Sequence, residues 1–306
     1  RPRIVISAVE HASVGETARD LARDGVDVAE LPVTGEGVLD LSALDRALDD
    51  RTTVVSIMHV NNELGTVEPL AAIGERVRAF RGNRPFPLFH SDAAQSLAHL
   101  PLDVHAINLD CATCSGYKLA GPKGIGVLFI SERCEKERLV LPQVTGGTHE
   151  FGLRAGTPAV ALAIGMAVAL ARSAARREAE VARLDKLAAH FVRELTEEVP
   201  GVRVNGIPLP ESRPCLSAGR LPTVWNVAFP GHCAKDLLVR LDMAGVAASA
   251  GSACASRSSQ VSHVLRAIGL PADRAKNSVR FSFGYRTTEE EVAEAVRRIA
   301  VAIRAA

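Results

Sequence analysis

Three side chains in this sequence have types and surroundings that suit chemistry at a shared site. They are Asp92 in HSDAAQ, Lys118 in SGYKLAGPKG and Cys254 in SAGSACAS. A lysine amine can form a Schiff base with an aldehyde, and a carboxylate can pair with a pyridinium nitrogen and keep such a ring an electron sink. A cysteine thiolate can attack a sulfur atom held nearby. Together these groups have the chemistry needed to hold pyridoxal phosphate and to take sulfur from an amino acid.

The surroundings of Asp92 and Lys118 favour a site over the solvated surface, where most lysines lie. Short apolar runs cover residues 87–90, 109–114 and 125–130, each bounded by Gly, Pro or polar residues, which is typical of buried strands. Asp92 and Lys118 each follow one of these runs. In open α/β sheets, ligands bind at the ends of strands, so we expect both side chains at one such edge.

The chain from residue 1 to about 157 alternates strand and helix patterns. We expect strands at Arg3–Ser7, Val26–Leu31 and Thr53–Met58, and helices at Val14–Asp24, Ser42–Asp49 and Ala71–Phe80. This βαβ rhythm predicts an α/β fold with a mainly parallel sheet covered on both faces.

A long pattern rich in Ala, Arg and Glu follows at about 158–195, and we expect an interrupted helix there, buried over 159–171. Beyond it the chain mixes strand and helix patterns, which predicts a smaller α+β unit. The expected strands are 202–204, 224–229 and 279–282, the expected helices are 234–243, 261–268 and 289–303, and the stretch 208–222 is expected to be a loop. We therefore expect a large domain over residues 1–170 and a small C-terminal domain over 171–306 that carries the Cys254 segment.

The composition excludes several classes of function. The chain has 306 residues and a formal net charge of +1, which argues against nucleic acid as a partner. No apolar run is long enough for a membrane span and no signal peptide is visible, while a hydrophobic content of 47% is ample for a large core. The six cysteines lack disulfide-scaffold spacing, which favours reduced thiols and a cytoplasmic protein.

The pair Cys111 and Cys114 has the spacing of a redox or metal motif. It lies within an expected strand, where residues three apart face opposite sides, and it has no second pair or nearby histidine. We expect core packing rather than metal or redox chemistry, because free cysteine is among the most buried residue types.

Six stretches of the sequence, taken in order, resemble successive motifs of the cysteine desulfurases, the pyridoxal-phosphate enzymes related to NifS and IscS within the class V aminotransferase type. They are MHVNNELGTVEPLAAIGE, FHSDAAQSLAHLPLDV, SGYKLAGPKGIGVLFI, GGTHEFGLRAGTPAV, SAGSACASRSSQVSHVLRAIGL and NSVRFSFGYRTTEEEV. The resemblance covers the chain from about Ile4 to its end. It implies the fold type I of pyridoxal-phosphate-dependent transferases.

The resemblance also implies roles around the cofactor. Lys118, rather than Lys123 of the same loop, matches the lysine that forms the Schiff base and later moves a proton. Ser115 matches a phosphate-binding serine, and Tyr117 replaces the family's usual histidine, so a phenol hydroxyl takes that place without the option of a positive charge. Asp92 matches the partner of the pyridinium nitrogen, and Gln95 the donor to the phenolate oxygen.

Four further residues take roles from the same resemblance. Asn62 matches an asparagine near the phenolate oxygen and the substrate carboxylate, and His11 a histidine that stacks on the ring and serves as an acid or base. Arg280 matches the residue that binds the substrate carboxylate, for which a planar guanidinium is well suited. Thr157 matches a threonine that reaches the phosphate of the neighbouring subunit, which implies a homodimer.

Cys254 matches the nucleophile that carries the persulfide, and its small, polar neighbours favour a loop. The implied reaction converts L-cysteine to L-alanine and passes sulfur to Cys254, from which a sulfur-acceptor protein or scaffold would receive it. Iron–sulfur cluster assembly, tRNA thiolation, DNA phosphorothioation and thio-metabolite synthesis all stay open as destinations.

Alternative functions also stay open. They are a selenocysteine lyase, another class V aminotransferase-type enzyme that does not depend on Cys254, and a truncated, non-catalytic homologue that acts as a binding subunit. The last arises because the sequence starts at Arg1, directly on an expected strand. The N-terminal part of the family, with a Gly-Ala-Thr-Glu-type turn that binds the cofactor phosphate, has no counterpart here.

Overall fold

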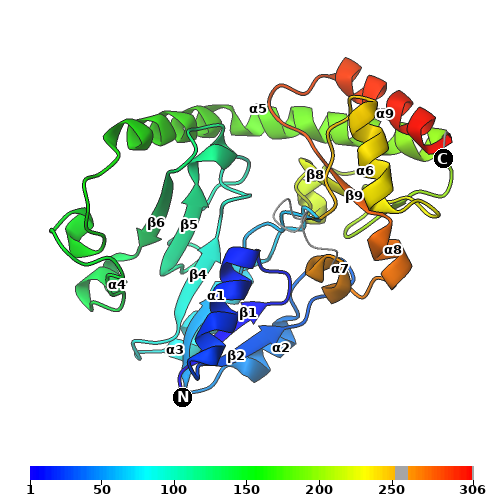
Figure 1. Ribbon diagram of the computed structural model, residues 1–306. Coiled ribbons are helices and arrows are strands. Elements are labelled where there is room, and N and C mark those ends of the chain that lie inside the picture. Colours follow the sequence, from blue (N-terminus) through cyan, green and yellow to red (C-terminus); the bar gives the residue numbers. More distant parts are fainter. Residues whose placement is uncertain (252–260, 305–306) are drawn as a thin grey trace.

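A computed structural model describes residues 1–251 and 261–304. Its larger sheet has six strands within this part of the chain and lies between helices (Figure 1). The strand order is β2 (Asp27–Leu31), β1 (Arg3–Ser7), β3 (Thr52–Ser56), β4 (Leu88–Asp92), β5 (Cys111–Ser115) and β6 (Gly126–Ile130). All neighbouring pairs are parallel except β5 with β6. The expected α/β fold is confirmed.

Helices α1 (Ala12–Arg23), α2 (Leu41–Ala47) and α3 (Leu70–Arg81) connect these strands. Their apolar faces pack on the β-branched and aromatic residues that face the core, for example Leu44 of α2, Val77 of α3 and Phe89 of β4, all fully buried. Helix α3 lies so close to its neighbour that a β-carbon at Gly74 would collide with the carbonyl oxygen of Ile107. This close approach requires glycine.

The carboxyl ends of the parallel strands meet at one edge of the sheet. Here β1 leads into the segment with His11, β3 leads into residues 57–66, and β4 ends at Asp92. Because the chain runs from β1 to β2 on one side and β3 lies on the other side, the strand order reverses next to β1. Ligands of open α/β sheets bind outside the carboxyl ends of strands at such a point.

Helix α5 (Val160–Glu198) is one continuous helix of 39 residues. The expected interruption is therefore wrong. The helix contains no proline, and its one glycine, Gly165, lies where a β-carbon would come within 3.1 Å of Pro122, so the glycine permits a close packing contact without breaking the helix. The expectation that residues 159–171 are buried is also wrong for most of that stretch, because Val160 and Ile164 are 61% and 60% exposed while Met166 is buried.

The C-terminal part contains a second, antiparallel sheet of β7 (Arg203–Val204), β8 (Val224–Ala228) and β9 (Ser278–Ser282). Helices α6 (Ala234–Met243) and α9 (Glu289–Arg304) and the second half of α5 enclose its core, which includes Phe191, Trp225 and Phe281. Short helices α4 (Glu132–Lys136), α7 (His263–Ala267) and α8 (Ala272–Lys276) and three short 3-10 turns complete the described chain. The sequence patterns did not predict α4 and α8, each of which has five residues.

A buried arginine joins the loop after β3 to the second sheet. Arg220 is fully buried, its guanidinium lies 3.9 Å from the ring centre of Trp225, and it donates to the carbonyl oxygens of Asn205 and Val224. The backbone of Arg220 forms an antiparallel bridge with Thr66. Burial lowers the pKa of Arg220 to about 9, so the guanidinium stays charged at neutral pH, and its Nη1 and Nη2 atoms donate to backbone carbonyl oxygens.

In the part of the chain that the structure describes, no helix is both long and apolar enough to cross a membrane.

Candidate active site

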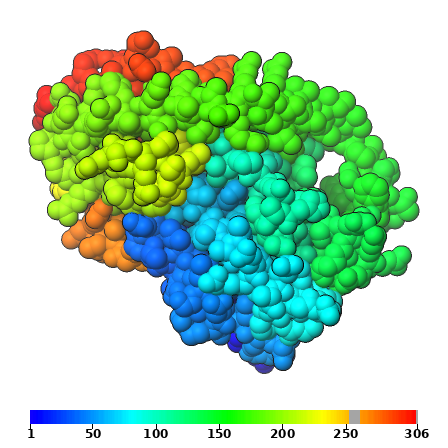
Figure 2. Space-filling view, turned by 180° about the vertical axis from the view of Figure 1, so that it is seen from behind, coloured from blue at the N-terminus to red at the C-terminus, as the bar shows by residue number. Residues whose placement is uncertain are grey.

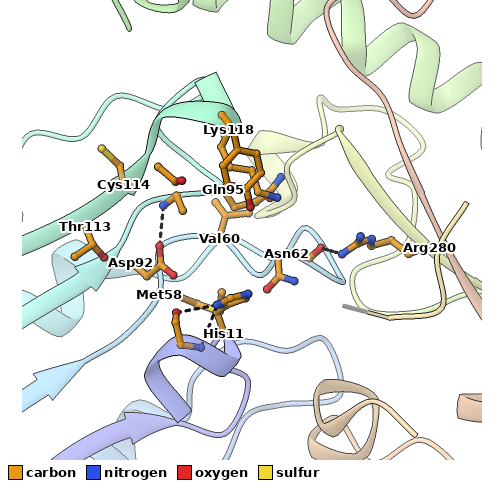
Figure 3. A pocket seen from close by; sticks show the side chains of 14 residues that line it. His11, Met58, Val60, Asn62, Asp92, Gln95, Thr113, Cys114, Lys118 and Arg280 are labelled. Carbon is orange, nitrogen blue, oxygen red and sulfur yellow. Dashed lines mark hydrogen bonds between the residues drawn. The ribbon is translucent and has the colours of Figure 1, made fainter. Parts of the chain in front are cut away.

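A cavity of about 310 Å³ lies at the carboxyl ends of the large sheet, between that sheet and β9 (Figure 3). Of the predicted site residues that the structure describes, all except Thr157 line it. The predicted residues in its lining are His11, Asn62, Asp92, Gln95, Ser115, Tyr117, Lys118 and Arg280. Residues more than 260 positions apart in the sequence therefore share one cavity.

Lys118 stands on the 3-10 turn η1 (Gly116–Leu119), directly after β5. Its Nζ donates a hydrogen bond of 3.0 Å to Oε1 of Gln95 and lies 5.5 Å from the ring centre of Tyr117. Gly116 makes this tight turn possible, since a β-carbon there would come within 2.7 Å of Ile125. By contrast, Lys123 of the same loop is exposed and does not line the cavity.

Asp92 ends β4 with its carboxylate at the cavity floor, where Oδ1 accepts a hydrogen bond of 2.8 Å from the backbone N–H of Ala94. Behind it lies Glu10, which is 2% exposed and accepts a 2.7 Å hydrogen bond from the N–H of Met58. Burial raises the pKa of Glu10 well above its usual range. This shift favours the neutral form of Glu10, which reduces the negative charge beside Asp92.

His11 caps the N-terminus of α1. Its Nδ1 accepts a hydrogen bond of 3.2 Å from the N–H of Ser13 and lies 2.8 Å from Oγ of the same residue. A neutral imidazole that accepts through Nδ1 carries its hydrogen on Nε2. The ring lines the cavity and is held in place by the helix it caps.

The two adjacent asparagines have different roles. Asn61 is fully buried, and its side chain accepts from the N–H groups of Glu63 and Leu64 and donates to the carbonyl oxygen of Val9. It therefore forms the turn. Asn62 lines the cavity, and its backbone carbonyl oxygen accepts a hydrogen bond of 3.0 Å from Nη1 of Arg280. Through this bond β9 of the second sheet closes one side of the cavity (Figure 3).

Two predicted residues are not placed in the cavity. Thr157 is exposed and does not line it. Cys254 lies outside the described residues. The structure adds lining residues that the sequence patterns did not single out, namely Ser13, Met58, Val60, Ala94, Thr113 and Cys114. Most of them could have been found from the sequence, because they lie close along the chain to His11, Asn62, Asp92 or Ser115.

The expectation of core packing for the Cys111 and Cys114 pair is right for the first and incomplete for the second. Cys111 is 7% exposed within the sheet, whereas Cys114 is partly buried and lines the cavity. A hydrogen bond with Cys134, together with burial, raises the pKa of the Cys111 thiol, and burial raises that of Cys114, so neither is a ready nucleophile. Among the residues described, no three metal-binding side chains cluster.

The donor set of the cavity fits pyridoxal phosphate. A lysine amine faces the cavity for the cofactor aldehyde, a carboxylate lies at its floor for the ring nitrogen, and the Gln95 amide lies beside the amine for the phenolate oxygen. The Ser115 and Tyr117 hydroxyls supply donors for a phosphate. A cavity of this size and polarity is typical of cofactor sites.

Comparison with known proteins agrees with this chemistry. Residues 1–294 match the protein family described as aminotransferase class-V. The chain belongs to that family. It is 37% identical over 289 residues to the cysteine desulfurase IscS of Dictyoglomus turgidum, and this match covers 94% of the chain and 69% of that protein.

Solved structures of the family have the same fold. A NifS-like protein superposes with a TM-score of 0.88 at 28% identity, over 100% of this chain and 76% of the other. SspA, solved in complex with cysteine, superposes with a TM-score of 0.74 at 31% identity, over 92% of this chain and 74% of the other. The family's enzymes depend on pyridoxal phosphate, and the fold is that of type I.

Proposed function

We propose that this chain is a pyridoxal-phosphate-dependent cysteine desulfurase that converts L-cysteine to L-alanine and passes the sulfur to Cys254 as a persulfide. The observation that carries the proposal is the cavity itself, in which the amine of Lys118, the carboxylate of Asp92 and the guanidinium of Arg280 face one space. The named relative is a cysteine desulfurase, and one structural neighbour binds cysteine.

Each residue of the cavity has a proposed role. Ser115 and Tyr117 bind the phosphate, Asp92 pairs with the ring nitrogen, Gln95 donates to the phenolate oxygen and His11 covers the ring. When bound, pyridoxal phosphate supplies an electron sink for charge that develops on the substrate. These roles use groups that the structure places around one cavity.

The substrate is proposed to bind through its carboxylate to Arg280 and Asn62. Lys118 is the base that moves a proton at the substrate α-carbon. The Cys254 thiolate then attacks the substrate sulfur, so that a sulfur–sulfur bond forms and the carbon–sulfur bond of cysteine breaks. Protonation of the remaining carbon skeleton leaves alanine, and the enzyme holds the sulfur.

The comparisons do not favour the alternatives. Another aminotransferase-type enzyme would not depend on Cys254, and a selenocysteine lyase would prefer selenocysteine to cysteine as its substrate. A non-catalytic binding subunit would not need the Lys118 amine to face the Asp92 carboxylate across a cavity.

We expect the protein loaded with pyridoxal phosphate to release equal amounts of alanine and sulfide from L-cysteine in the presence of a thiol reductant. The stoichiometry follows because each substrate gives up one sulfur. Amino-acid analysis and sulfide detection on the same samples measure both products. Pyruvate or an amino-group transfer product in place of alanine would contradict the proposal.

We also propose that two copies of the chain form a homodimer. Large apolar side chains are exposed along one region that includes β6, η2 (Glu150–Gly152) and the start of α5, where Leu128, Phe151 and Ile164 are 51%, 91% and 60% exposed. Exposed apolar patches of this kind mark interaction sites. Thr157 is exposed in the same stretch of chain, as a residue that serves the partner's phosphate would be. Figure 2 shows α5 in green along the outside of the molecule.

In sedimentation, the cofactor-loaded protein is expected to have twice the 32.4 kDa mass of the chain. Ile164→Glu should shift it toward the monomer, because a charge would be buried against a partner. The matched control is Val239→Glu, since Val239 is also 60% exposed but lies on α6, away from this region. A monomer with full activity would contradict the dimer.

The remaining proposals concern domains, partners and location. We propose a large domain over residues 1–170 and a small domain over 171–306, with the boundary inside α5. The sulfur acceptor is a protein, and neither nucleic acid nor a membrane is a direct partner. A cytoplasmic location is proposed because the cysteines among the described residues are free thiols.

A further inference from the structure

A buried carboxylate next to the cavity has no role in the chemistry above. Glu63 is 1% exposed and follows Asn62 in the turn after β3. The Asn61 side chain holds this turn by accepting from the N–H of Glu63 at 2.9 Å. Burying a carboxylate is costly unless it is hydrogen-bonded, so its partners indicate what it does.

The partners of Glu63 flank the segment that carries Cys254. Its Oε2 accepts a hydrogen bond of 2.7 Å from Oγ of Ser262. Gly251 has a φ of +70°, and a β-carbon on it would lie 3.1 Å from the same Oε2 and 3.3 Å from Cβ of Ser262. Gly251 and Ser262 are eleven positions apart in the sequence, so the chain returns to the same carboxylate.

Both flanks are also tied to residues of the cavity. Ser249 forms an antiparallel bridge with Arg280, with N···O distances of 3.0 and 2.6 Å, and Arg280 in turn donates to the carbonyl oxygen of Asn62. On the other flank, Ser262 caps α7, and Nε2 of His263 lies 2.9 Å from the carbonyl oxygen of Glu10, the neighbour of His11. Arg280 thus links Ser249, two residues before Gly251, to Asn62, the neighbour of Glu63.

We propose that Glu63 is a positioning residue that holds both flanks of the Cys254 segment at the cavity, and so sets how often the thiol meets the substrate sulfur. The proposal rests on the proposed function. Its physical basis is that fixing the ends of a short segment raises the effective concentration of a group on it. The carboxylate is hydrogen-bonded to Ser262 on one flank and packs closely against Gly251 on the other, so its loss should loosen both.

The test compares Glu63→Ala and Ser262→Ala with the wild type. Glu63→Gln is the conservative variant. Glu30→Ala is the control, because Glu30 is an exposed carboxylate of the large sheet. Mixing with L-cysteine separates two steps: the spectral change of the bound cofactor, and the appearance of persulfide on Cys254 measured by mass spectrometry of quenched samples. We expect Glu63→Ala and Ser262→Ala each to slow persulfide formation about tenfold or more while the rate of the spectral change stays within twofold.

Two features distinguish positioning from a general loss of structure. The double variant should be no slower than the slower single variant, because each removes the same contact, and Glu63→Gln should recover most of the rate since its amide oxygen still accepts from Ser262. In the cofactor-free protein, hydrogen exchange of the amides in 249–251 and 262–265 should be about tenfold faster in Glu63→Ala, as expected when an anchoring bond is lost.

Equal losses in the spectral step and in persulfide formation, or a persulfide rate in Glu63→Ala within twofold of the wild type, would overturn the proposal. If Glu63→Ala does not fold, Ser262→Ala decides by the same criteria, and Glu63→Gln should still keep most of the wild-type persulfide rate. A wild-type protein that forms no persulfide on Cys254 would instead reject the proposed function, and hydrogen exchange without cofactor would still report whether Glu63 holds the flanks.

Discussion

Lys118→Ala is expected to abolish alanine formation from L-cysteine, with a loss of about 10³-fold or more. The expected loss is large because the proposed mechanism uses this one amine twice, first as the attachment point of the cofactor and then as the base at the substrate α-carbon. The structure places this amine 3.0 Å from Gln95 within the cavity. Steady-state assay of alanine measures the effect.

Lys123→Ala is the matched control, since Lys123 lies on the same loop but is exposed and outside the cavity. It should retain wild-type activity. Borohydride reduction of the loaded wild type should attach the cofactor to the peptide that contains Lys118, and peptide mapping locates it. Label on Lys123 would show that the attachment site is wrong.

Cys254→Ala is expected to remove persulfide and sulfide formation entirely and to leave cofactor binding unchanged. The residues proposed to hold the cofactor, among them Asp92 and Lys118, line the described cavity, and none of their proposed roles in holding the cofactor needs a thiol. The variant should still show a spectral change with L-cysteine, because that step needs Lys118 and Arg280 but no thiol. Catalysis stops where the carbon–sulfur bond must break toward a nucleophile.

For this variant Cys233→Ala is the control, because Cys233 is the exposed free cysteine among the described residues. Sulfide release is measured in single-turnover and steady-state experiments. Release from Cys254→Ala at the wild-type rate would contradict the persulfide mechanism and favour a thiol-independent elimination.

Sequence periodicity predicted most of the fold because its helices and strands have local causes. The short apolar runs before Asp92 and Lys118 became β4 and β5, and the helix expected at 234–243 coincides with α6. The cavity could be anticipated for a related reason. Parallel strands end at one edge of a sheet, so residues that follow them meet even when they are far apart in sequence.

Tertiary packing decided the features that were mispredicted. Gly165 resembled a break in the helix pattern, but Pro122 of the Lys118 loop packs against it and the helix continues. The apolar residues of the same stretch resembled a core, although Val160 and Ile164 face outward. Periodicity shows that a face is apolar and does not show what covers it.

Contacts between residues far apart in the sequence could not be predicted from sequence patterns. Glu63 and Ser262 are 199 positions apart, and neither lies in a pattern that points to the other. The raised pKa of Glu10 also depends on burial that only the folded chain reveals. Such pairs follow from the way the two sheets meet.

The continuous helix α5 connects the two parts of the molecule as one rigid element. Its first half packs on the Lys118 loop, where Ala169 approaches Gly121, and its second half, with Leu187 and Phe191, belongs to the core around β8 and β9. At about 1.5 Å per residue the rod is roughly 58 Å long, so a tilt of about 5° displaces a point about 30 Å from the pivot by nearly 3 Å. Because the helix is continuous, a rotation at one end of it also moves the other end. A rotation of the second sheet that moves Arg280 would therefore also be transmitted to the loop that holds Lys118, so the two sides of the cavity are mechanically linked through α5.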